Sequence, residues 1–483
     1  MPASEGFMVW DGPVYVDSAG PFPCLLSMFR SVIASSMKSQ PQTPSITRRR
    51  FLAAATTATV AFQMVPRHVL GGAGQTPPSE KLNIAGVGIG GMGSGDIGAV
   101  ASENIVALCD VDQRALDNNA KRFPNAKLHR DFRKMLETQK DIDAVVVATP
   151  DHQHAIVSIT AMKMGKHVHC QKPLTHSVYE ARMMAKIAKE QKVATQMGNQ
   201  GQAGESPRVI AELILSGAIG TVREIHAGSN RYPAISPRGI RRPQERPPVP
   251  EWMNWDLWLG PAPERPYHPT YHPFAWRGWW DFGTGCLGDI GCHQLSCVFK
   301  ALKLGHPISV EASSSNNQCP PEIANETAPV SSITRWEFPA EGERAPLSIT
   351  WWDGGLKPPR PPEIQPNQGF ANDDWLMVVG DKGKIYGDRI IPAARAKEIG
   401  TPPRVLARSP GHYVEWIQAC KGGAPAGSNF VDIAAHLTEV VLLGNIAIRS
   451  KAKLLWDGPN LRFTNYDDAN QLINPPYRAG WSL

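Results

Sequence analysis

A glycine-rich turn between two apolar runs is the feature that most restricts the fold of this sequence. Leu82–Val87 predicts a short buried strand, and Ile105–Cys109 predicts a second one. The turn after the first run has the spacing G-x-G-x-x-G, at Gly88, Gly90 and Gly93, with Gly91 inside it. In a strand–turn–helix unit, such glycines allow a tight turn, close approach of a pyrophosphate, and packing of helix on strand. The pattern favours a dinucleotide-binding unit over a flexible loop.

The residue after the second strand indicates which dinucleotide fits. Asp110 follows the glycine turn by about 20 residues, where a carboxylate binds the ribose hydroxyls and repels a 2′-phosphate. The predicted helix after the turn would direct its first N–H groups at the phosphates. These features predict NAD rather than NADP as the cofactor.

Length and charge limit the possible organisation. At 483 residues the chain exceeds one ordinary domain, and we expect a nucleotide-binding domain at 81–200 and a second domain at 201–483. The formal charge of +6 is small for this length, so no nucleic-acid partner is predicted.

The front of the chain differs from the rest. We interpret residues 1–36 as a disordered extension or the result of a misplaced start codon, and 37–80 as a signal and linker. Thr47–Leu52 (TRRRFL) matches a twin-arginine export signal, and the apolar run that follows it is too short to span a bilayer. We therefore expect export, to the periplasm or an equivalent compartment. No clear cleavage site follows, which leaves open a retained anchor in contact with the membrane.

The eight cysteines form no C-x-x-C pair and no cysteine–histidine cluster with zinc spacing, so no metal site is predicted.

Two further strand ends of the nucleotide domain carry polar candidates. Asp143–Thr149 is a continuous apolar run typical of a buried parallel strand, and its end should lie over the cofactor. His167–Cys170 predicts the next strand, after which Pro173 restricts the backbone beside a lysine. His152 is expected to be structural, whereas a ligand contact and a helix-capping role are both open for His154. The candidates for cofactor contact here are Thr149, Pro150, His154 and Lys172.

From Gly201 onward the pattern predicts a different kind of domain. Val222–Gly228 alternates as a strand with one wet face does, and several later runs predict a large, mostly antiparallel sheet. Tyr232–Pro273 is rich in proline, arginine and tryptophan, and we expect an ordered loop without regular elements that folds over the cofactor cleft. A second proline-rich loop, Gly355–Asn372, is expected near the mouth of the same cleft. No run after the leader predicts a transmembrane helix.

A helix expected to begin near Leu287 carries a carboxylate and an imidazole on one face. Asp289 and His293 are four residues apart, so Asp289 can orient His293 and stabilise its imidazolium form. Taken alone, the spacing fits an ordinary ion pair or a helix cap equally well.

Taken together, three motifs resemble the glucose–fructose oxidoreductase / inositol dehydrogenase (Gfo/Idh/MocA) superfamily. They are the glycine turn, the strand ending in TPDHQH, and QKP at Gln171–Pro173, where most members have Glu-Lys-Pro. The resemblance implies an α/β protein with an N-terminal Rossmann domain on a parallel sheet and a C-terminal α+β domain with a large open sheet. It also implies that Lys172, Asp289 and His293 form the catalytic group. Gln171 removes a negative charge beside Lys172.

Aromatic residues before the catalytic helix are candidates for substrate contact. Trp279 and Trp280 could stack on a sugar ring, and Arg277 could bind hydroxyls or a carboxylate. A role for all three in the core and rim of the domain is equally open. The segment from Trp255 to Trp280 resembles that of exported bacterial members.

These features predict an exported NAD-dependent oxidoreductase that transfers hydride between a sugar or polyol hydroxyl carbon and nicotinamide. One alternative is a glycosidase that oxidises its substrate transiently and eliminates the aglycone. Another is a sugar- or nucleotide-binding protein without catalysis. An open sheet face commonly forms a dimer surface, so a homo-oligomer is expected.

Overall fold

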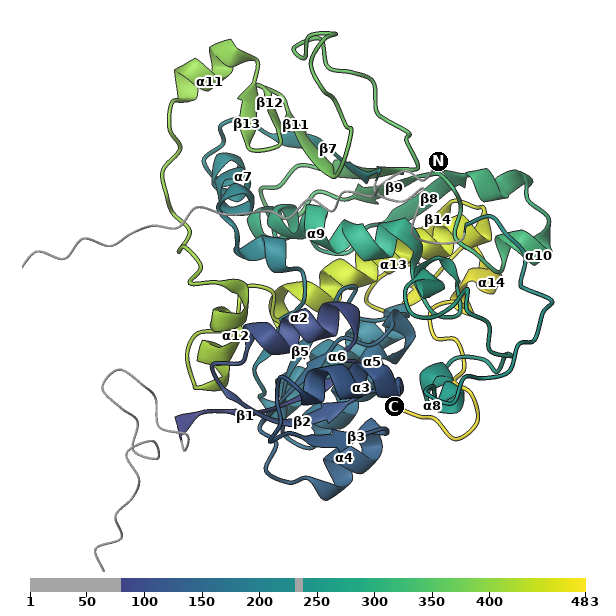
Figure 1. Cartoon of the computed structure of the whole chain (residues 1–483). Coiled ribbons are helices and arrows are strands. Elements are labelled where there is room, and N and C mark those ends of the chain that lie inside the picture. The colour runs from purple at the N-terminus through teal and green to yellow at the C-terminus, as the bar shows by residue number, and fades with distance from the viewer. Residues whose placement is uncertain (1–79, 231–237) are drawn as a thin grey trace, which may run out of the picture. The chain divides into compact units, whose positions relative to one another are not determined.

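The structure is a computed structural model that describes residues 80–230 and 238–483. The extension that we place at 1–36 and the signal and linker at 37–80 lie, apart from residue 80, outside the described residues. Figure 1 shows the first domain in purple to blue and the second domain in teal, green and yellow. The predicted combination of a parallel sheet with a larger, mostly antiparallel sheet is confirmed.

The first domain is a six-stranded parallel sheet in the order β3-β2-β1-β4-β5-β6. Its central strand Ala144–Val147 is apolar along its whole length because helices cover both faces of the sheet. The strands are β1 (Asn83–Val87), β2 (Asn104–Cys109), β3 (Lys127–His129), β4 (Ala144–Val147), β5 (His167–Cys170) and β6 (Thr195–Met197). The helices are α2 (Gly91–Ala99), α3 (Gln113–Ala120), α4 (Phe132–Thr138), α5 (Asp151–Lys163) and α6 (Val178–Gln191).

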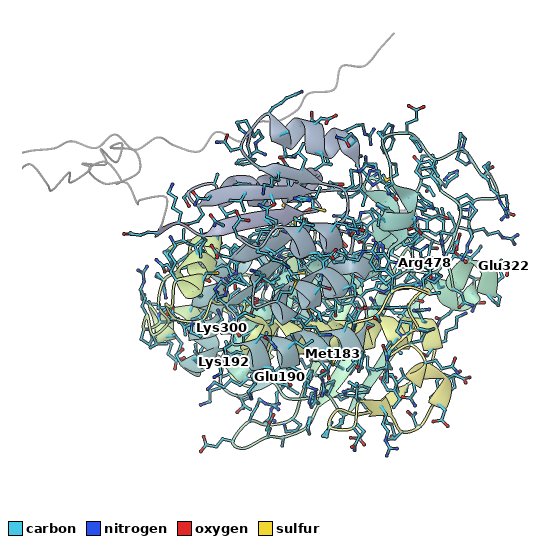
Figure 2. The ribbon with its side chains drawn as sticks, turned by 90° about the horizontal axis from the view of Figure 1, so that it is seen from below. Met183, Glu190, Lys192, Lys300, Glu322 and Arg478 are labelled. Carbon is cyan, nitrogen blue, oxygen red and sulfur yellow. The ribbon has the colours of Figure 1, made fainter. Side chains whose placement is uncertain are left out.

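Local capping explains why α6 begins at Val178. The side chain of Ser177 accepts the backbone N–H of Glu180, and the Glu180 carboxylate accepts the N–H of Ser177 at 2.8 Å. This capping box satisfies two N–H groups that the first helical turn leaves without partners. Figure 2 labels Met183 and Glu190 on this helix.

The second domain contains a nine-stranded sheet in the order β13-β12-β11-β7-β10-β9-β8-β14-β15. The pairing of β10 with β7 is parallel and the other strand pairs are antiparallel. The strands are β7 (Val222–Ser229), β8 (Ser309–Ser314), β9 (Ser332–Phe338), β10 (Leu347–Asp353), β11 (Trp375–Gly380), β12 (Lys384–Tyr386), β13 (Arg389–Ile391), β14 (Leu454–Asp457) and β15 (Arg462–Phe463). The helices are α7 (Glu205–Leu215), α8 (Trp255–Leu259), α9 (Gly285–Leu302), α10 (Pro321–Ala324), α11 (Ala393–Ile399), α12 (His412–Cys420), α13 (Ala435–Ser450) and α14 (Asp467–Asn470).

Two long helices form the layer between the sheets. α13 packs against α9, against α6 of the first domain, and against β8 of the large sheet, while α9 also contacts β7 (Figure 1). Together with the preceding π-helical turn, α13 is the one helix among the described residues long and apolar enough to cross a membrane, with a mean hydropathy of 1.6. Because 78% of this segment is buried inside the fold, it is a core helix. This corrects the expectation that no segment after the leader has such a composition.

Chain order and spatial grouping differ at one helix. α12 follows the strands of the large sheet, yet Trp416 and Ile417 lie in an apolar cluster with Ile84 and Val146 of the first domain. The chain therefore returns to the nucleotide-binding sheet after building most of the second one. The predicted boundary at residue 200 separates the strands of the two sheets, but α12, which follows this boundary in the sequence, packs with the first domain.

The loop at 355–372 is not where we expected it. Phe370 packs on Tyr386 and Trp375, with ring centroids 5.5 and 6.3 Å apart, so the loop covers one end of the large sheet. None of its residues lines the cofactor cavity described below. Its apolar side chains are buried against the large sheet and not against the cleft.

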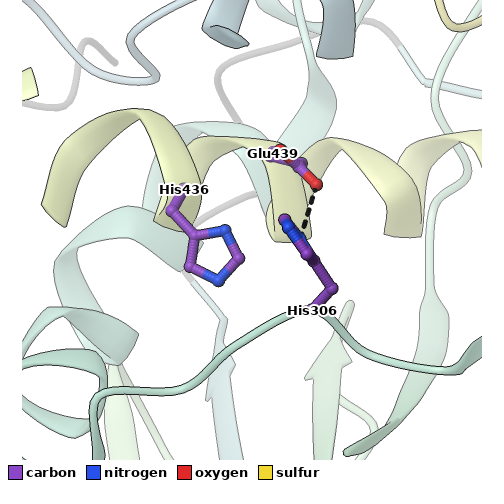
Figure 3. A group of neighbouring side chains, drawn as sticks. All are labelled: His306, His436 and Glu439. Carbon is purple, nitrogen blue, oxygen red and sulfur yellow. Dashed lines mark ion pairs between the residues drawn. The ribbon is translucent and has the colours of Figure 1, made fainter. Parts of the chain in front are cut away.

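A polar cluster joins the two domains at α6 and α13. His306, His436 and Glu439 lie together and could in principle hold a metal ion (Figure 3). However, the guanidinium of Arg182 binds both carboxylate oxygens of Glu439, and His306 lies 3.1 Å from the same carboxylate. These contacts lower the pKa of Glu439 to about 2, overcoming the effect of burial. The ion pair between Arg182 on α6 and Glu439 on α13 therefore joins the two domains.

Candidate active site at the edge of the parallel sheet

A cavity of about 710 Å³ lies along the carboxyl ends of the parallel strands. This volume is in the range of cofactor and ligand sites, and the position is where open α/β sheets bind nucleotides. Every residue that we predicted for cofactor contact lines this cavity, with the exception of Gly93. These lining residues are Gly88, Gly90, Gly91, Asp110, Thr149, Pro150, His154 and Lys172.

The glycine turn has the geometry that a dinucleotide requires. Gly88 has a φ of +76°, and a Cβ atom there would lie 2.7 Å from the backbone nitrogen of Thr149. At Gly93 a Cβ atom would lie 1.9 Å from the carbonyl oxygen of Gly88, so only glycine lets α2 approach β1 this closely. Gly90 faces the cavity with no such crowding. The first and third glycines shape the turn, and the second leaves space for phosphate.

Asp110 is bound to the backbone of the turn. One carboxylate oxygen accepts the N–H groups of Ile89 and Gly90 at 2.8 and 3.2 Å, and the other accepts the N–H of Asp112 at 2.9 Å. Burial raises the pKa of Asp110 to about 6, although these hydrogen bonds oppose the rise. The carboxylate thus fixes the turn while it lines the cavity.

The predicted catalytic group is assembled from both domains. Lys172, directly after β5, places its Nζ 2.5 Å from Oδ1 of Asp289 on α9. The same oxygen lies 3.4 Å from Nε of Arg277. His293 lies one helical turn further along α9. Lys172 and Arg277 line the cavity, whereas Asp289 and His293 are not among its lining residues.

Arg277 is held between aromatic rings at the cavity wall. Its guanidinium lies 4.0 Å from the ring centroid of Phe274 and 4.3 Å from that of Trp276. Stacking of this kind fixes the side chain without using up all its N–H donors. Arg277 therefore lies at the cavity wall beside the Lys172–Asp289 pair, and its contact with substrate stays a prediction.

Trp279 and Trp280 are not placed to stack on a substrate, which corrects one of the two roles left open for them. Trp279 is fully buried and meets Tyr271 edge-on, with centroids 5.0 Å apart. Trp280 is 4% exposed, and its indole N–H donates to the carbonyl of Ala324. Their bulk closes the core behind the catalytic helix, and neither ring lines the cofactor cavity.

His154 links the ends of two neighbouring strands. Its ring nitrogens lie 2.8 Å from the carbonyl oxygens of Pro173 and Thr149, an arrangement in which both must donate. Burial alone would lower the pKa of His154, but Cys170 and the two carbonyls outweigh it and raise the pKa above its usual value. These two contacts fix the end of β4 against the backbone that carries Lys172.

His152 has the structural role that we expected. Its ring lies between the carbonyl oxygens of Trp258 and Phe282, and burial lowers its pKa to about 3. Through Trp258 it attaches the long loop to the first domain.

The loop itself covers the cavity, as the sequence indicated. Leu257, Trp258 and His272 line the cavity, and the N–H of Gln113 donates to the carbonyl of Trp252 at 2.8 Å. Contrary to our expectation, the loop contains a regular element, α8, which the side chain of Asn254 caps. Residues 232–237 of the loop lie outside the described residues.

Sequence reasoning missed two buried acids beside the catalytic group. Asp96 on α2 is fully buried and accepts the side-chain N–H of Gln171 at 2.8 Å, and burial raises its pKa. The side chain of Gln171 therefore has an acidic neighbour. Asp151, the first residue of α5, is the acidic residue of the TPDHQH motif, in which only the two histidines were considered as candidates.

Asp151 has an unusual environment for a carboxyl group. It is 2% exposed and lines the cavity, and one oxygen accepts the hydroxyl of Thr284 at 2.7 Å. The other oxygen is buried and has no hydrogen-bond partner among the described residues. Burial raises the pKa of Asp151 to about 7, with the charge of Asp289 adding to the rise.

The parallel sheet, the glycine turn and the cavity at the strand ends fit a dinucleotide-binding protein. Residues 82–199 match the family model described as an oxidoreductase family with an NAD-binding Rossmann fold. Residues 239–324 match the model of the C-terminal alpha/beta domain of the same family. The chain belongs to the Gfo/Idh/MocA oxidoreductase family.

Relatives of known name match parts of the chain. The inositol 2-dehydrogenase of Rubrobacter xylanophilus is 29% identical over 166 residues, 33% of this chain and 47% of that protein. The levoglucosan dehydrogenase of Pseudarthrobacter phenanthrenivorans is 30% identical over 103 residues, 21% of this chain and 26% of that protein. A glycosyl hydrolase family 109 protein of Shewanella pealeana is 24% identical over 155 residues, 30% of this chain and 34% of that protein. The chain thus spans at most about half the length of these relatives.

Solved structures share the fold over most of this chain. The WlbA dehydrogenase of Bordetella pertussis, solved with NADH and UDP-GlcNAcA, is 18% identical with a TM-score of 0.54. It covers 78% of this chain, and 98% of its own length is matched. GenD2 from gentamicin A biosynthesis, solved with NAD, is 17% identical with a TM-score of 0.52, and the match covers 80% of this chain and 99% of GenD2.

The crowding at Gly93 gives a first prediction. Replacing Gly93 by alanine should destabilise the protein by about 1–3 kcal/mol and abolish dinucleotide binding, because the methyl group forces α2 away from the turn. The matched control is Gly95→Ala on the same helix, where a methyl group meets nothing within 4 Å. It should be neutral or stabilising by up to about 1 kcal/mol. Chemical unfolding and NAD titration measure both effects, and equal behaviour of the two variants would contradict the proposed packing.

The buried carboxyl gives a pH-dependent prediction. Because the pKa of Asp151 is about 7 in the folded chain and about 4 in an unfolded one, its ionisation destabilises the fold. The cost is absent below about pH 4, grows between pH 4 and 7, and is complete above pH 7. Asp151→Asn should therefore match the wild type at pH 4 and exceed its unfolding free energy by up to about 4 kcal/mol at pH 8. Asp141→Asn, at an exposed position, is the control. If the unfolding free energies of Asp151→Asn and the wild type differ by the same amount at every pH, the raised pKa of Asp151 is contradicted.

Proposed function

We propose that the protein transfers hydride between a hydroxyl-bearing carbon of a sugar or polyol and NAD. The observation that carries the proposal is the contact between Lys172 and Asp289, at 2.5 Å, beside a cavity that begins at the glycine turn. The names of the two dehydrogenases above support a carbohydrate or polyol substrate. A bound nicotinamide would accept or supply the hydride.

The residues that line the cavity fit a dinucleotide. The turn between Gly88 and Gly93 offers backbone without side chains, and α2 directs its first N–H groups toward the same end of the cavity. Asp110 would bind the ribose hydroxyls and disfavour a 2′-phosphate. Arg114 also lines the cavity, but its guanidinium is held by Asp112 at 2.7 Å and stacks on Trp252. These features support NAD over NADP.

Three side chains would act on the substrate hydroxyl: Lys172, Asp289 and His293. Lys172 and Asp289 form a pair whose side chains are each 12% exposed, which keeps competing water away from the reacting atoms. Lys172 would hold the hydroxyl oxygen and Asp289 would orient the ammonium group. His293, one turn further on α9, would take the proton as hydride leaves.

One observation favours a second candidate function, a glycosidase that oxidises its substrate transiently. Elimination of an aglycone requires an additional proton-transfer group, and Asp151 provides a cavity-lining carboxyl beyond those that a dehydrogenase needs. A relative bears the name glycosyl hydrolase family 109 protein. Release of aglycone from a glycoside without added NAD would support this reading, whereas steady NADH formation from a free sugar or polyol supports the first.

Location and assembly are also proposals. We propose that the TRRRFL motif directs export with the cofactor already bound, which cell fractionation of an Arg-to-Lys triple variant at 48–50 would test. We further propose a homo-oligomer that uses the face of the large sheet carrying Arg335 and Glu337, whose side chains are 43% and 35% exposed. A monomeric mass by light scattering would reject that assembly.

Variants of the ion pair test the function directly. Lys172→Met removes the ammonium group that would hold the hydroxyl oxygen, and Asp289→Asn removes the carboxylate that would orient this ammonium group. Each change should lower turnover about 100-fold or more while NAD binding is retained. Lys186→Met, an exposed change on α6, serves as the control and should leave turnover unaltered. Turnover should be followed as NADH absorbance over a panel of sugars and polyols. Full activity in Lys172→Met, or no turnover of any panel member by the wild type, would favour a binding protein without catalysis.

A further inference from the structure

One wall of the cofactor cavity comes from the last residues of the sequence. Trp481 lines the cavity although the strands of the first domain end nearly 300 residues earlier in the chain. Its ring packs on Phe132 of α4, with centroids 6.3 Å apart, and the guanidinium of Arg133 lies 4.4 Å from its centroid. Asp131 fixes that guanidinium at 2.7 Å. The indole is therefore held against the first domain.

The strand order shows which half of the cavity Trp481 covers. Lys172 follows β5, and Phe132 follows β3, which is four strands away in the order β3-β2-β1-β4-β5. With a strand spacing of 4.7–4.9 Å, these two ends of the cavity are roughly 19 Å apart. A dinucleotide crosses the sheet edge between them, with its phosphates at the turn after β1. If the nicotinamide lies at Lys172, the adenosine half lies on the side of β2 and β3, where Trp481 is.

A single arginine attaches this segment to the loop that covers the cavity. The N–H of Arg478 donates to the carbonyl of Pro261 at 2.9 Å, and its side chain binds the carbonyl of Gly260 at 3.0 Å. It also binds the carboxylate and the carbonyl of Asp256 at 2.6 and 2.9 Å. Figure 2 labels Arg478. Since Asp256 lies on α8, whose Leu257 and Trp258 also line the cavity, the segment and α8 form one cover.

The indole is suited to a purine ring. Trp481 is only partly buried, so ring surface remains at the cavity wall beyond its contacts with Phe132 and Arg133. A flat, polarisable ring held in place by neighbours loses little entropy when another aromatic ring stacks on it. The cavity wall beside it carries Asp110 and Asp112, which suit ribose hydroxyls better than a further phosphate.

We propose that the segment Tyr477–Leu483 closes the adenosine half of the cavity and that Trp481 packs on the bound dinucleotide there, slowing its release. The inference rests on the proposed function, since it assigns the cofactor's orientation from Lys172. It assigns Trp481 to cofactor retention, not to catalysis. A slowly released cofactor would be carried through repeated reactions instead of being exchanged after each one.

The test is the rate at which the loaded protein releases NADH. The full chain is loaded with NADH and chased with excess NAD, and NADH fluorescence is followed. Trp481→Ala should release NADH about 10-fold faster, the effect expected for loss of one aromatic stack. Trp481→Phe should stay close to the wild type, and Arg478→Ala, which detaches the segment without altering the indole, should resemble Trp481→Ala. Ser482→Ala, an exposed change in the same segment, is the matched control.

The outcomes separate this inference from the proposed function. If the wild type binds NADH and oxidises substrate but Trp481→Ala and Arg478→Ala release NADH no faster than Ser482→Ala, the inference is wrong and the function stands. If the wild type binds no NADH, both are wrong. Equal thermal unfolding midpoints for Trp481→Ala and Ser482→Ala would show that faster release does not come from a damaged fold.

Discussion

The contact between the ammonium of Lys172 and the carboxylate of Asp289 is the interaction on which the site depends. Lys172 comes from the end of β5 in the parallel sheet, whereas Asp289 comes from α9 beneath the large sheet. The pair therefore forms only when the two sheets are correctly placed across the α9–α13 layer. Breaking a buried pair leaves one charge without compensation, so each half of the site stabilises the position of the other.

Both partners are positioned by buried titratable neighbours. The ring of His154 ties the end of β4 to the carbonyl of Pro173 next to Lys172. Asp151 accepts the hydroxyl of Thr284 immediately before α9 begins, which fixes the start of the helix that carries Asp289. Buried groups with shifted pKa values concentrate at functional sites, and here they surround one pair of residues. Positioning and electrostatics are therefore supplied by the same side chains.

Sequence reasoning was most accurate where structure is local. The capping box at Ser177 and the apolar run of β4 specify their own elements, so α6 and the nucleotide-binding sheet could be predicted closely. The parallel pairing of β10 with β7 could not, because it depends on partners more than 100 residues apart. The same limit applies to the site: burial of Trp279 in the core and the arrival of Trp481 at the cavity are long-range contacts with no local pattern.

The most direct test of the account is a structure of the protein with bound NAD. In that structure we expect the pyrophosphate at the turn between Gly88 and Gly93, the nicotinamide beside Lys172, and the adenosine half under Trp481. A single substrate hydroxyl should then be able to reach both the ammonium of Lys172 and the reacting carbon of the nicotinamide. A nicotinamide bound away from the end of β5, out of reach of the Lys172–Asp289 pair, would contradict the assignment of the active site.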